Sequence, residues 1–234
     1  MLTFIQPFDD IDSFPPLEKA LKEPNGLLAL GGDLSPERLL KAYQQGIFPW
    51  FNEGDLIQWW SPDPRLVLYP AEFHSSRSLK KNIKRCNYEF SINQAFDTVI
   101  HACAAPREYA NSTWITGDMI EAYNKLHQMG FAHSVEIWSH GKLVGGLYGL
   151  AFGKIFFGES MFNLQTDASK SAFMVLSREL EQQGFALIDC QVPSEHLKTM
   201  GAREIDRPVF KQVLAHHCQT INPVNLTRKK QPIM

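Results

Sequence analysis

Three segments rich in β-forming residues follow one another in residues 134–162, which read SVEIWSHGKLVGGLYGLAFGKIFFGESMF. Two short turns that contain glycine separate them, as in a series of hairpins. We therefore expect strands at 134–138, 143–152 and 155–162. A long helical pattern at 168–183 and an apolar strand at 186–192 come next. This order of elements predicts an α+β fold with a mixed, mainly antiparallel sheet.

Shorter elements flank this centre. We expect helices at 36–45, 77–86, 94–104, 118–129, 194–200 and 208–217, and strands at 66–69, 88–92 and 203–205. Ser35 and Pro36 suit a helix start, because serine caps the first turn and proline fits its first position. A proline cluster at 61–64 predicts a boundary between a small N-terminal domain, 1–62, and a larger domain, 63–234.

The chain has 234 residues, of which 44% are hydrophobic and 21% charged, as in a globular protein with a substantial core. Its net charge of −2 argues against a surface coated by nucleic acid but allows a local basic patch. Residues 225–232 have little to bury, so we expect disorder there. No segment has the roughly 18 apolar residues that span a bilayer, and no basic start precedes an apolar run. We expect no membrane association and a cytoplasmic protein.

The four cysteines are scattered along the chain and form no C-x-x-C pair. They are Cys86, Cys103, Cys190 and Cys218. Such spacing argues against a metal site and against a disulfide framework, so buried free thiols are expected. Nothing in the sequence demands more than a monomer.

A polar pair interrupts the apolar strand Leu187–Val192. Side chains alternate along a strand, so we expect Asp189 and Gln191 on one side and Cys190 on the other. From the residues alone, Asp189 is either a functional acid or a cap for the helix that begins near Ser194. Cys190 is a rival as nucleophile, but because it faces away from the pair we expect a core thiol.

Glu159 has apolar neighbours on both sides within Phe156–Phe162. A carboxylate in such surroundings binds a cation or joins a hydrogen-bond network. The simpler interpretation, an exposed acid at the end of a strand, also stays open.

Five cations occur without an intervening acid in the helix expected at 77–86. They are Arg77, Lys80, Lys81, Lys84 and Arg85. All of them except Lys80 recur at helical spacing and share one face. A solvated helix face is the ordinary explanation of such a run. Unrelieved repulsion between the cations favours a phosphate partner, and contacts of that kind hold nucleic acid without reading its sequence.

Glycine, proline and tryptophan combine in three motifs of the N-terminal part. They are EPNGLLALGGDL at 23–34, GIFPWF at 46–51 and WWSPDPR at 59–65. As a set they resemble the N-terminal part of leucyl/phenylalanyl-tRNA–protein transferases, and the resemblance is also strong over 156–170 and 187–192. That bacterial family moves an amino acid from a charged tRNA onto the N-terminus of a protein. The resemblance implies a GNAT-like acyltransferase domain after the small N-terminal one.

The resemblance also implies the substrates and the catalytic residues. The donors would be Leu-tRNA and Phe-tRNA, with methionine left open, and the acceptors would be proteins that begin with Arg or Lys. Transfer would mark them for degradation by the N-degron pathway. Asp189 would orient or polarise Gln191, Gln191 would help the acceptor amine to lose its proton, and Glu159 would suit a cationic acceptor. An aminoacyl ester is already activated, so we expect no metal and no cofactor.

Further residues match substrate positions of the family. Tyr43, Trp50, Trp114 and Tyr123 match the site of the tRNA 3′ end, where aromatic rings could stack on adenine. Leu147, Phe156, Met161, Phe173 and Leu176 match the amino-acid pocket. Arg77, Lys81, Lys84 and Arg85 match contacts with the tRNA backbone. Each apolar or aromatic residue, taken singly, also suits an ordinary core position.

Two alternatives remain. A CoA-dependent GNAT N-acetyltransferase would carry a glycine-rich pyrophosphate loop before the long helix, but residues 163–170 read NLQTDASK, without glycine. A tRNA-binding module without chemistry would leave Asp189, Gln191 and Glu159 idle, and substitutions there would not change tRNA affinity.

Overall fold

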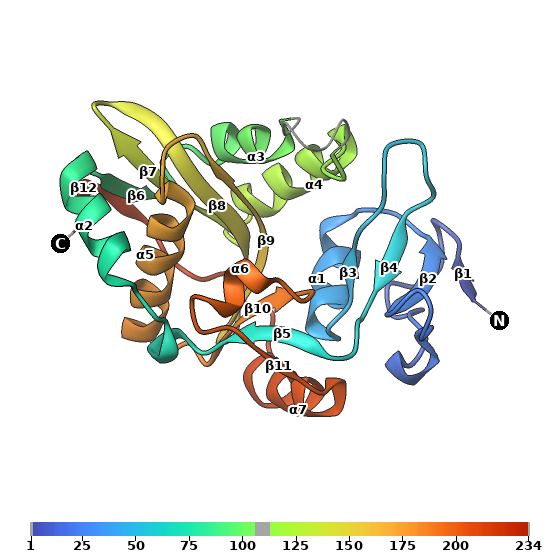
Figure 1. The fold of residues 1–234 in the computed structure, drawn as a ribbon. Helices are drawn as coiled ribbons and strands as arrows, with labels where there is room; N and C mark the ends of the chain where they lie inside the picture. Colours follow the sequence, from blue (N-terminus) through green and yellow to red (C-terminus); the bar gives the residue numbers. More distant parts are fainter. Residues whose placement is uncertain (1, 106–112, 234) are drawn as a thin grey trace.

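The computed structural model describes residues 2–105 and 113–233, and within them the chain forms two sheets (Figure 1). The smaller sheet lies in the N-terminal part and has the strand order β1-β2-β4-β3. Its strands are β1 (Thr3–Ile5), β2 (Leu27–Gly31), β3 (Phe48–Pro49) and β4 (Gln58–Trp60). The sequence did not predict this sheet, because strands of two to five residues are too short for alternation to show.

Eight strands of the described residues form the larger sheet, in the order β11-β5-β10-β9-β8-β7-β6-β12. They are β5 (Arg65–Leu68), β6 (Glu89–Ile92), β7 (Ala132–Ser139), β8 (Lys142–Phe152), β9 (Ile155–Asn163), β10 (Leu187–Gln191), β11 (Arg203–Ile205) and β12 (Arg228–Pro232). Neighbouring strands run antiparallel except β9 and β10, which pair in parallel. The predicted α+β class with a mixed, mainly antiparallel sheet is confirmed.

Helices lie on both faces of the larger sheet, with α2 and α5 on one face and α3 and α4 on the other (Figure 1). The helices are α1 (Pro36–Gln44), α2 (Arg77–Cys86), α3 (Phe96–Ala104), α4 (Gly117–Gln128), α5 (Ala168–Gln182), α6 (Glu195–Lys198) and α7 (Arg207–His217), with 3-10 turns at Leu17–Lys19 and Pro70–Glu72. No helix of the described residues combines the length and apolar composition that a membrane crossing needs.

Two clusters of buried apolar side chains lie on the two faces of this sheet. Because strand side chains alternate, Phe156 of β9 belongs to the cluster under α2 and α5, whereas Phe157 belongs to the cluster under α3 and α4. The latter cluster continues into the N-terminal part, where Tyr43, Phe48 and Trp59 join it. One core therefore extends to both sides of the expected domain boundary, which stays a prediction.

The C-terminal tail is folded, so the expected disorder of residues 225–232 is wrong. Strand β12 pairs antiparallel with β6, and Leu226 just before it is 1% exposed. Arg228 NH2 lies 2.8 Å from Oε2 of Glu179 in α5. Without β12, strand β6 would be an edge with unpaired backbone groups. The polar tail pairs with this edge through backbone hydrogen bonds, and amino-acid composition does not reveal such pairing.

Candidate active site

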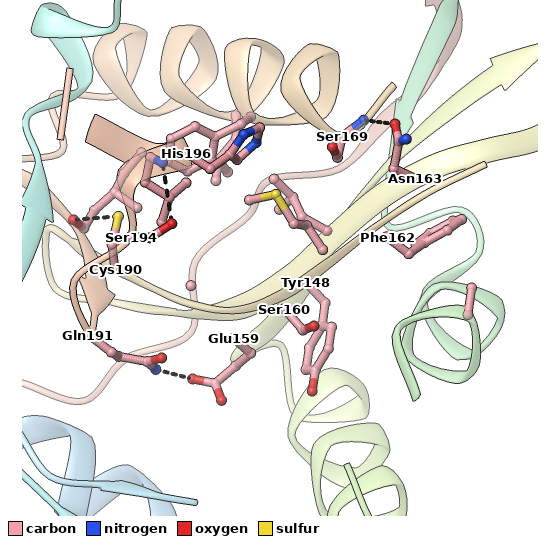
Figure 2. Close-up of a pocket in the computed structure, with 18 of the residues that line it drawn as sticks. Tyr148, Glu159, Ser160, Phe162, Asn163, Ser169, Cys190, Gln191, Ser194 and His196 are labelled. Carbon is pink, nitrogen blue, oxygen red and sulfur yellow. Dashed lines mark hydrogen bonds between the residues drawn. The ribbon is translucent and has the colours of Figure 1, made fainter. Parts of the chain in front are cut away.

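A cavity of about 1050 Å³ opens between strands β9 and β10 and helix α5 (Figure 2). The parallel pairing of the two strands ends at Phe157 and Asp189. Strand β9 continues along β8 to Asn163, whereas β10 ends at Gln191. The cavity therefore lies where the two strands part.

Apolar side chains form much of the cavity wall. Strand β8 contributes Leu147, strand β9 contributes Phe156 and Met161, and helix α5 contributes Phe173 and Leu176. These are the five residues that the sequence resemblance assigns to an amino-acid pocket, and the structure brings all five to one cavity. Their role in holding an amino acid stays a prediction.

Glu159 also lines the cavity, although its side chain is only 8% exposed. Its Oε1 accepts hydrogen bonds from the Tyr43 hydroxyl at 2.7 Å and from Gln191 Nε2 at 2.9 Å, and its Oε2 accepts one from the Tyr123 hydroxyl at 3.0 Å. Burial raises the pKa of this carboxyl to about 7, although the three hydrogen bonds act in the opposite direction. Glu159 is therefore no exposed strand-end acid, and it can exchange a proton near neutral pH.

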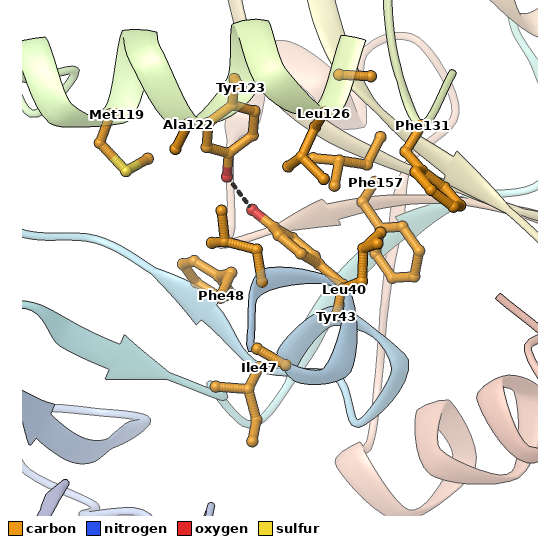
Figure 3. Packing of buried hydrophobic residues seen from close by; sticks show 14 of the residues in the cluster. Leu40, Tyr43, Ile47, Phe48, Met119, Ala122, Tyr123, Leu126, Phe131 and Phe157 are labelled. Carbon is orange, nitrogen blue, oxygen red and sulfur yellow. Dashed lines mark hydrogen bonds between the residues drawn. The ribbon is translucent and has the colours of Figure 1, made fainter. Parts of the chain in front are cut away.

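The two tyrosines belong to helices α1 and α4, and their hydroxyls also contact each other (Figure 3). Both side chains are 0% exposed, and burial raises the pKa of both hydroxyls, so they remain protonated donors. Tyr43 thus donates its hydroxyl proton in a hydrogen bond to Glu159 within the protein, and its assignment to the tRNA 3′ end stays a prediction. Tyr123 offers no open ring face for stacking on adenine, because its ring is packed in the core and its hydroxyl serves Glu159.

The end of β10 departs from regular strand geometry. Its pairing with β5 shifts register between Asp189 and Gln191, and Gln191 has a φ of 64°. This left-handed conformation ends the regular pairing of β10 with β5. The Gln191 amide bonds Glu159, which Tyr43 of the cluster under α3 and α4 holds. Asp189 bonds Arg65, which stacks on Phe48 of the same cluster. Cys190 instead packs against the cluster under α2 and α5 and lines the cavity from there. These contacts agree with the expectation that Asp189 and Gln191 share one side, away from Cys190.

Cys190 is half-buried, packs against the core cluster under α2 and α5, and also lines the cavity. Burial raises the pKa of its thiol, and the neighbouring Asp189 adds to that effect. Because the thiolate is the nucleophilic form of cysteine, a raised pKa makes Cys190 a poor nucleophile. The rival chemistry is disfavoured on this ground, and also because Cys190 faces away from Asp189 and Gln191, as the sequence predicts.

Asp189 is fully buried, and its partner Arg65 is a site residue that sequence reasoning missed. Arg65 donates from Nε to Oδ1 at 2.8 Å and from NH2 to Oδ2 at 2.7 Å, and Oδ1 also accepts the Gln191 N–H at 3.0 Å. The sequence did carry a signal for Arg65, because an arginine directly before the apolar segment 66–69 becomes buried with that strand and then needs an acidic partner. The helix near Ser194 is capped by that serine's own hydroxyl, so Asp189 is not its cap.

The two tryptophans assigned to the tRNA 3′ end occupy different places. Trp114 is half-buried and lines the cavity. Trp50 is 41% exposed, and its ring centre lies 5.5 Å from that of Trp60 in the N-terminal sheet. Trp50 is not among the described residues that line the cavity, but it has the exposed ring that stacking requires. Both assignments stay predictions.

Helix α2 buries Leu79 and Ile83 and turns its cations outward. The exposed cations include Arg77, Lys81, Lys84 and Arg85. None of these four forms an ion pair with an acid in the part of the chain that the structure describes. The expected contact with a tRNA backbone stays a prediction.

The sequence raises the question of two other kinds of site, one for a metal ion and one for the pyrophosphate of CoA. Among residues 2–105 and 113–233, no group of three or more histidine, cysteine, aspartate or glutamate side chains could hold a metal ion. At the start of α5, where a pyrophosphate would bind, the first backbone amides are already engaged. The Ala168 N–H donates to Gln165 O at 3.0 Å, and the Ser169 N–H donates to Asn163 Oδ1 at 3.4 Å (Figure 2).

Known proteins resemble the chain over most of its length. A relative from Stutzerimonas stutzeri named leucyl/phenylalanyl-tRNA–protein transferase is 59% identical over 217 residues, which cover 93% of this chain and 95% of the relative. A relative of the same name from Nitrosomonas eutropha is 62% identical and covers 86% of each chain. Among solved structures, L-PGS from Bacillus licheniformis is similar at a TM-score of 0.42 and 12% identity, over 68% of this chain and 53% of that one.

Two family models match consecutive parts of the chain. The model described as leucyl/phenylalanyl-tRNA protein transferase matches residues 67–215, and the model described as the N-terminal domain of that transferase matches residues 32–63. Together with the identity to relatives of that name, these matches show that the chain belongs to the leucyl/phenylalanyl-tRNA protein transferase family.

Proposed function

We propose that this chain transfers leucine or phenylalanine from aminoacyl-tRNA to the N-terminal Arg or Lys of acceptor proteins. One observation carries the proposal: a single cavity joins an apolar wall to the buried Glu159–Gln191 pair. Membership in the family supports the same reaction. The product would carry leucine or phenylalanine at its N-terminus and would enter the N-degron pathway. We expect the reaction in the cytoplasm, where charged tRNA is found.

The reaction is the aminolysis of an ester. The α-amine nitrogen of the acceptor attacks the aminoacyl carbonyl carbon, a C–N bond forms, and the bond from that carbon to the ribose oxygen breaks. The amine loses a proton and the ribose oxygen gains one. Because the ester is activated, the enzyme has to align the two groups, keep the amine neutral and stabilise the charge on the carbonyl oxygen.

Gln191 is suited to receive the acceptor amine. Its Nε2 is committed to Glu159 Oε1 at 2.9 Å, which sets the orientation of the amide. The amide oxygen is then the atom that can accept an N–H from the incoming amine. Gln191 in this arrangement orients the nucleophile and does not itself take the proton.

Glu159 is suited to take the proton. A pKa of about 7 means that both protonation states are populated at neutral pH, which is the condition a general base requires. The hydroxyls of Tyr43 and Tyr123 hold the carboxylate in place. Its negative charge also favours acceptors whose α-amine and side chain are both cationic, as they are in arginine and lysine.

The apolar wall is suited to leucine or phenylalanine in the donor. A hydrophobic pocket distinguishes one methylene by only ~1–3 kcal/mol, so rejection of valine and isoleucine has to come from shape near the Cβ atom. The wall combines two aromatic rings, Phe156 and Phe173, with the unbranched thioether of Met161. Such side chains can form a slot for a side chain that branches beyond Cβ.

The CoA alternative is disfavoured by the start of α5. Two backbone amides that would bind a pyrophosphate instead bond Gln165 O and Asn163 Oδ1. The helix also packs closely on the sheet, since a Cβ atom at Gly145 would lie 2.5 Å from that of Ala168. The pyrophosphate of CoA would have to displace the oxygens of Gln165 and Asn163 from these backbone N–H groups.

The test is the transfer of labelled phenylalanine from charged tRNA to a peptide that begins with Arg, beside the same peptide beginning with Ala. We expect transfer to the Arg peptide alone. Transfer to neither, with charged tRNA still bound, would leave a tRNA-binding module. Equal transfer to both would remove the acceptor preference, and acetylation from acetyl-CoA without tRNA would favour the alternative enzyme.

A further inference from the structure

Arg65 lies at a buried contact that joins several parts of the molecule. Its NH1 group donates to the carbonyl oxygen of Gly46 at 3.2 Å. Its Cζ atom lies 4.8 Å from the ring centre of Phe48 and 4.8 Å from that of Phe210. Arg65 itself belongs to β5 and is 0% exposed. One side chain thus ties β5 to the end of α1, to the N-terminal sheet and to α7.

Asp189 occupies the remaining side of the guanidinium. Both of its oxygens accept hydrogen bonds from Arg65, and Oδ1 also accepts the N–H of Gln191. Asp189 is not one of the described residues that line the cavity. The carboxylate therefore bonds groups of the protein itself, away from the place where substrates would meet.

The same contact supports an unusual backbone conformation at Gln191. A φ of 64° lies in a region that residues other than glycine rarely adopt. The bond from its N–H to Asp189 Oδ1 holds the turn, and the turn brings the side-chain amide to Glu159. The orientation of that amide thus depends on Asp189, and the position of Asp189 depends on Arg65.

We propose that Arg65 is a positioning residue for aminoacyl transfer, and that Asp189 acts by holding the backbone of Gln191 rather than by carrying a proton. The inference rests on the function proposed above. A lysine cannot replace the arginine, because its single ammonium group cannot bond both carboxylate oxygens in the plane of a fork and reach Gly46 as well.

The first test is Arg65→Lys, measured as kcat and KM for Phe-tRNA with an Arg peptide. We expect kcat to fall ~100-fold, since an error of about 1 Å in the position of a reacting group costs that much, while KM stays nearly unchanged. Arg38→Lys is the matched control, because Arg38 is 1% exposed and bonds Asp33 at 3.1 Å outside the cavity. A kcat unchanged in Arg65→Lys, or lowered equally in both variants, would overturn the proposal.

The second test compares two double variants that lack the buried charges. Arg65→Gln with Asp189→Asn keeps an amide oxygen at position 189 that can accept the Gln191 N–H. Arg65→Met with Asp189→Leu removes that acceptor. We expect the first to be at least about tenfold more active than the second, because only the first can still hold the turn. Equal activity of the two would show that holding Gln191 through its backbone is not the role of residue 189.

Wild-type activity separates this inference from the proposed function. If the wild-type chain does not transfer phenylalanine, the proposed function fails. If the wild type is active and either test gives its contrary result, the reaction stands and the role assigned to Arg65 fails.

Discussion

Asn82 in α2 donates a hydrogen bond from Nδ2 to Oδ2 of Asp167 at 2.6 Å, and Asp167 directly precedes α5. The Tyr88 hydroxyl, just beyond α2, donates to the carbonyl oxygen of Thr166 at 2.9 Å. The loop that these two bonds hold connects β9 to α5, both of which line the cavity. Helix α2 is therefore hydrogen-bonded to the loop that joins two elements of the cavity wall, β9 and α5.

Asn82→Ala should impair the reaction of charged tRNA and leave the chemical step at the cavity unchanged. If α2 holds the tRNA body, loss of this bond misaligns that body with the cavity, and a net hydrogen bond of about 0.5–1.5 kcal/mol corresponds to a ~2–10-fold loss in kcat/KM for Phe-tRNA. Phenylalanyl-adenosine, which lacks the tRNA body, should react as before. The control is Ser78→Ala, an exposed α2 position whose hydroxyl contacts only that of Ser76 among the described residues. Equal losses with both donors would mean that the bond supports the cavity itself.

Lys84→Ala combined with Arg85→Ala should weaken the binding of charged tRNA most at low salt. Each lost phosphate contact removes up to about 0.9 from the slope of log affinity against log salt, so the double variant should have a slope shallower by up to about 2. Affinity measured over a salt series checks this. Lys211→Ala serves as control. Lys211 is an exposed cation of α7, and its Nζ already forms an ion pair with Oε1 of Glu18 at 2.6 Å. A parallel shift of the salt curve would contradict a phosphate contact.

Transfer should depend on the ionisation of Glu159. With its pKa raised to about 7 by burial, kcat/KM should rise with pH up to about 7 and then level off. Glu159→Gln should lower the rate and remove this inflection. The α-amine of the acceptor also titrates, so the profile should be taken with two peptides of different amine pKa. An inflection that follows the peptide would exclude Glu159 as its source.

The same carboxyl should make stability fall with rising pH. Its folded pKa of about 7 lies above the ordinary value of 4.5, so the folded state binds more protons between those two pH values. The unfolding free energy contributed by this group is complete below about pH 4.5 and is lost as pH rises through 7, by on the order of 3 kcal/mol. Urea unfolding of wild type and Glu159→Gln across this range checks it, and parallel curves would contradict the assignment.

Leu147→Phe should shift donor preference toward leucine. Leu147 is 3% exposed, lines the cavity and pairs across the sheet with Met161, so a larger ring there shortens the space for a phenylalanine donor. We expect kcat/KM for Phe-tRNA to fall about tenfold relative to Leu-tRNA, within the range that one or two methylenes decide. Competition between the two charged tRNAs measures the ratio. An unchanged ratio would place the donor side chain elsewhere.

The local pattern of residues was enough to predict the helices and strands that have a strong periodicity. Helix α2 has the predicted bounds, because Ser76 caps it with a hydrogen bond from the Leu79 N–H at 3.1 Å and its apolar and cationic residues separate onto two faces. The polar interruptions at Asp189, Gln191 and Glu159 were visible as well, since polar residues within apolar strands stand out in any sequence.

Other features follow from contacts between residues far apart in the chain, and these could not be predicted. Strand β12 forms because β6 offers it a free edge, and the strands of the N-terminal sheet are too short to carry a pattern of their own. The turn at Gln191 is held by Asp189, and Asp189 is held by Arg65, which lies 124 positions earlier.

The sequence by itself determined the helices, the strands of the larger sheet other than β12 and the residue types of the site, because these depend on neighbours within a few positions. Only the tertiary structure decided that Tyr43, Tyr123 and Gln191 meet at Glu159, and that burial there raises the pKa of its carboxyl to about 7. Desolvation and hydrogen bonding depend on which distant groups surround an atom, and that arrangement exists only once the chain has folded.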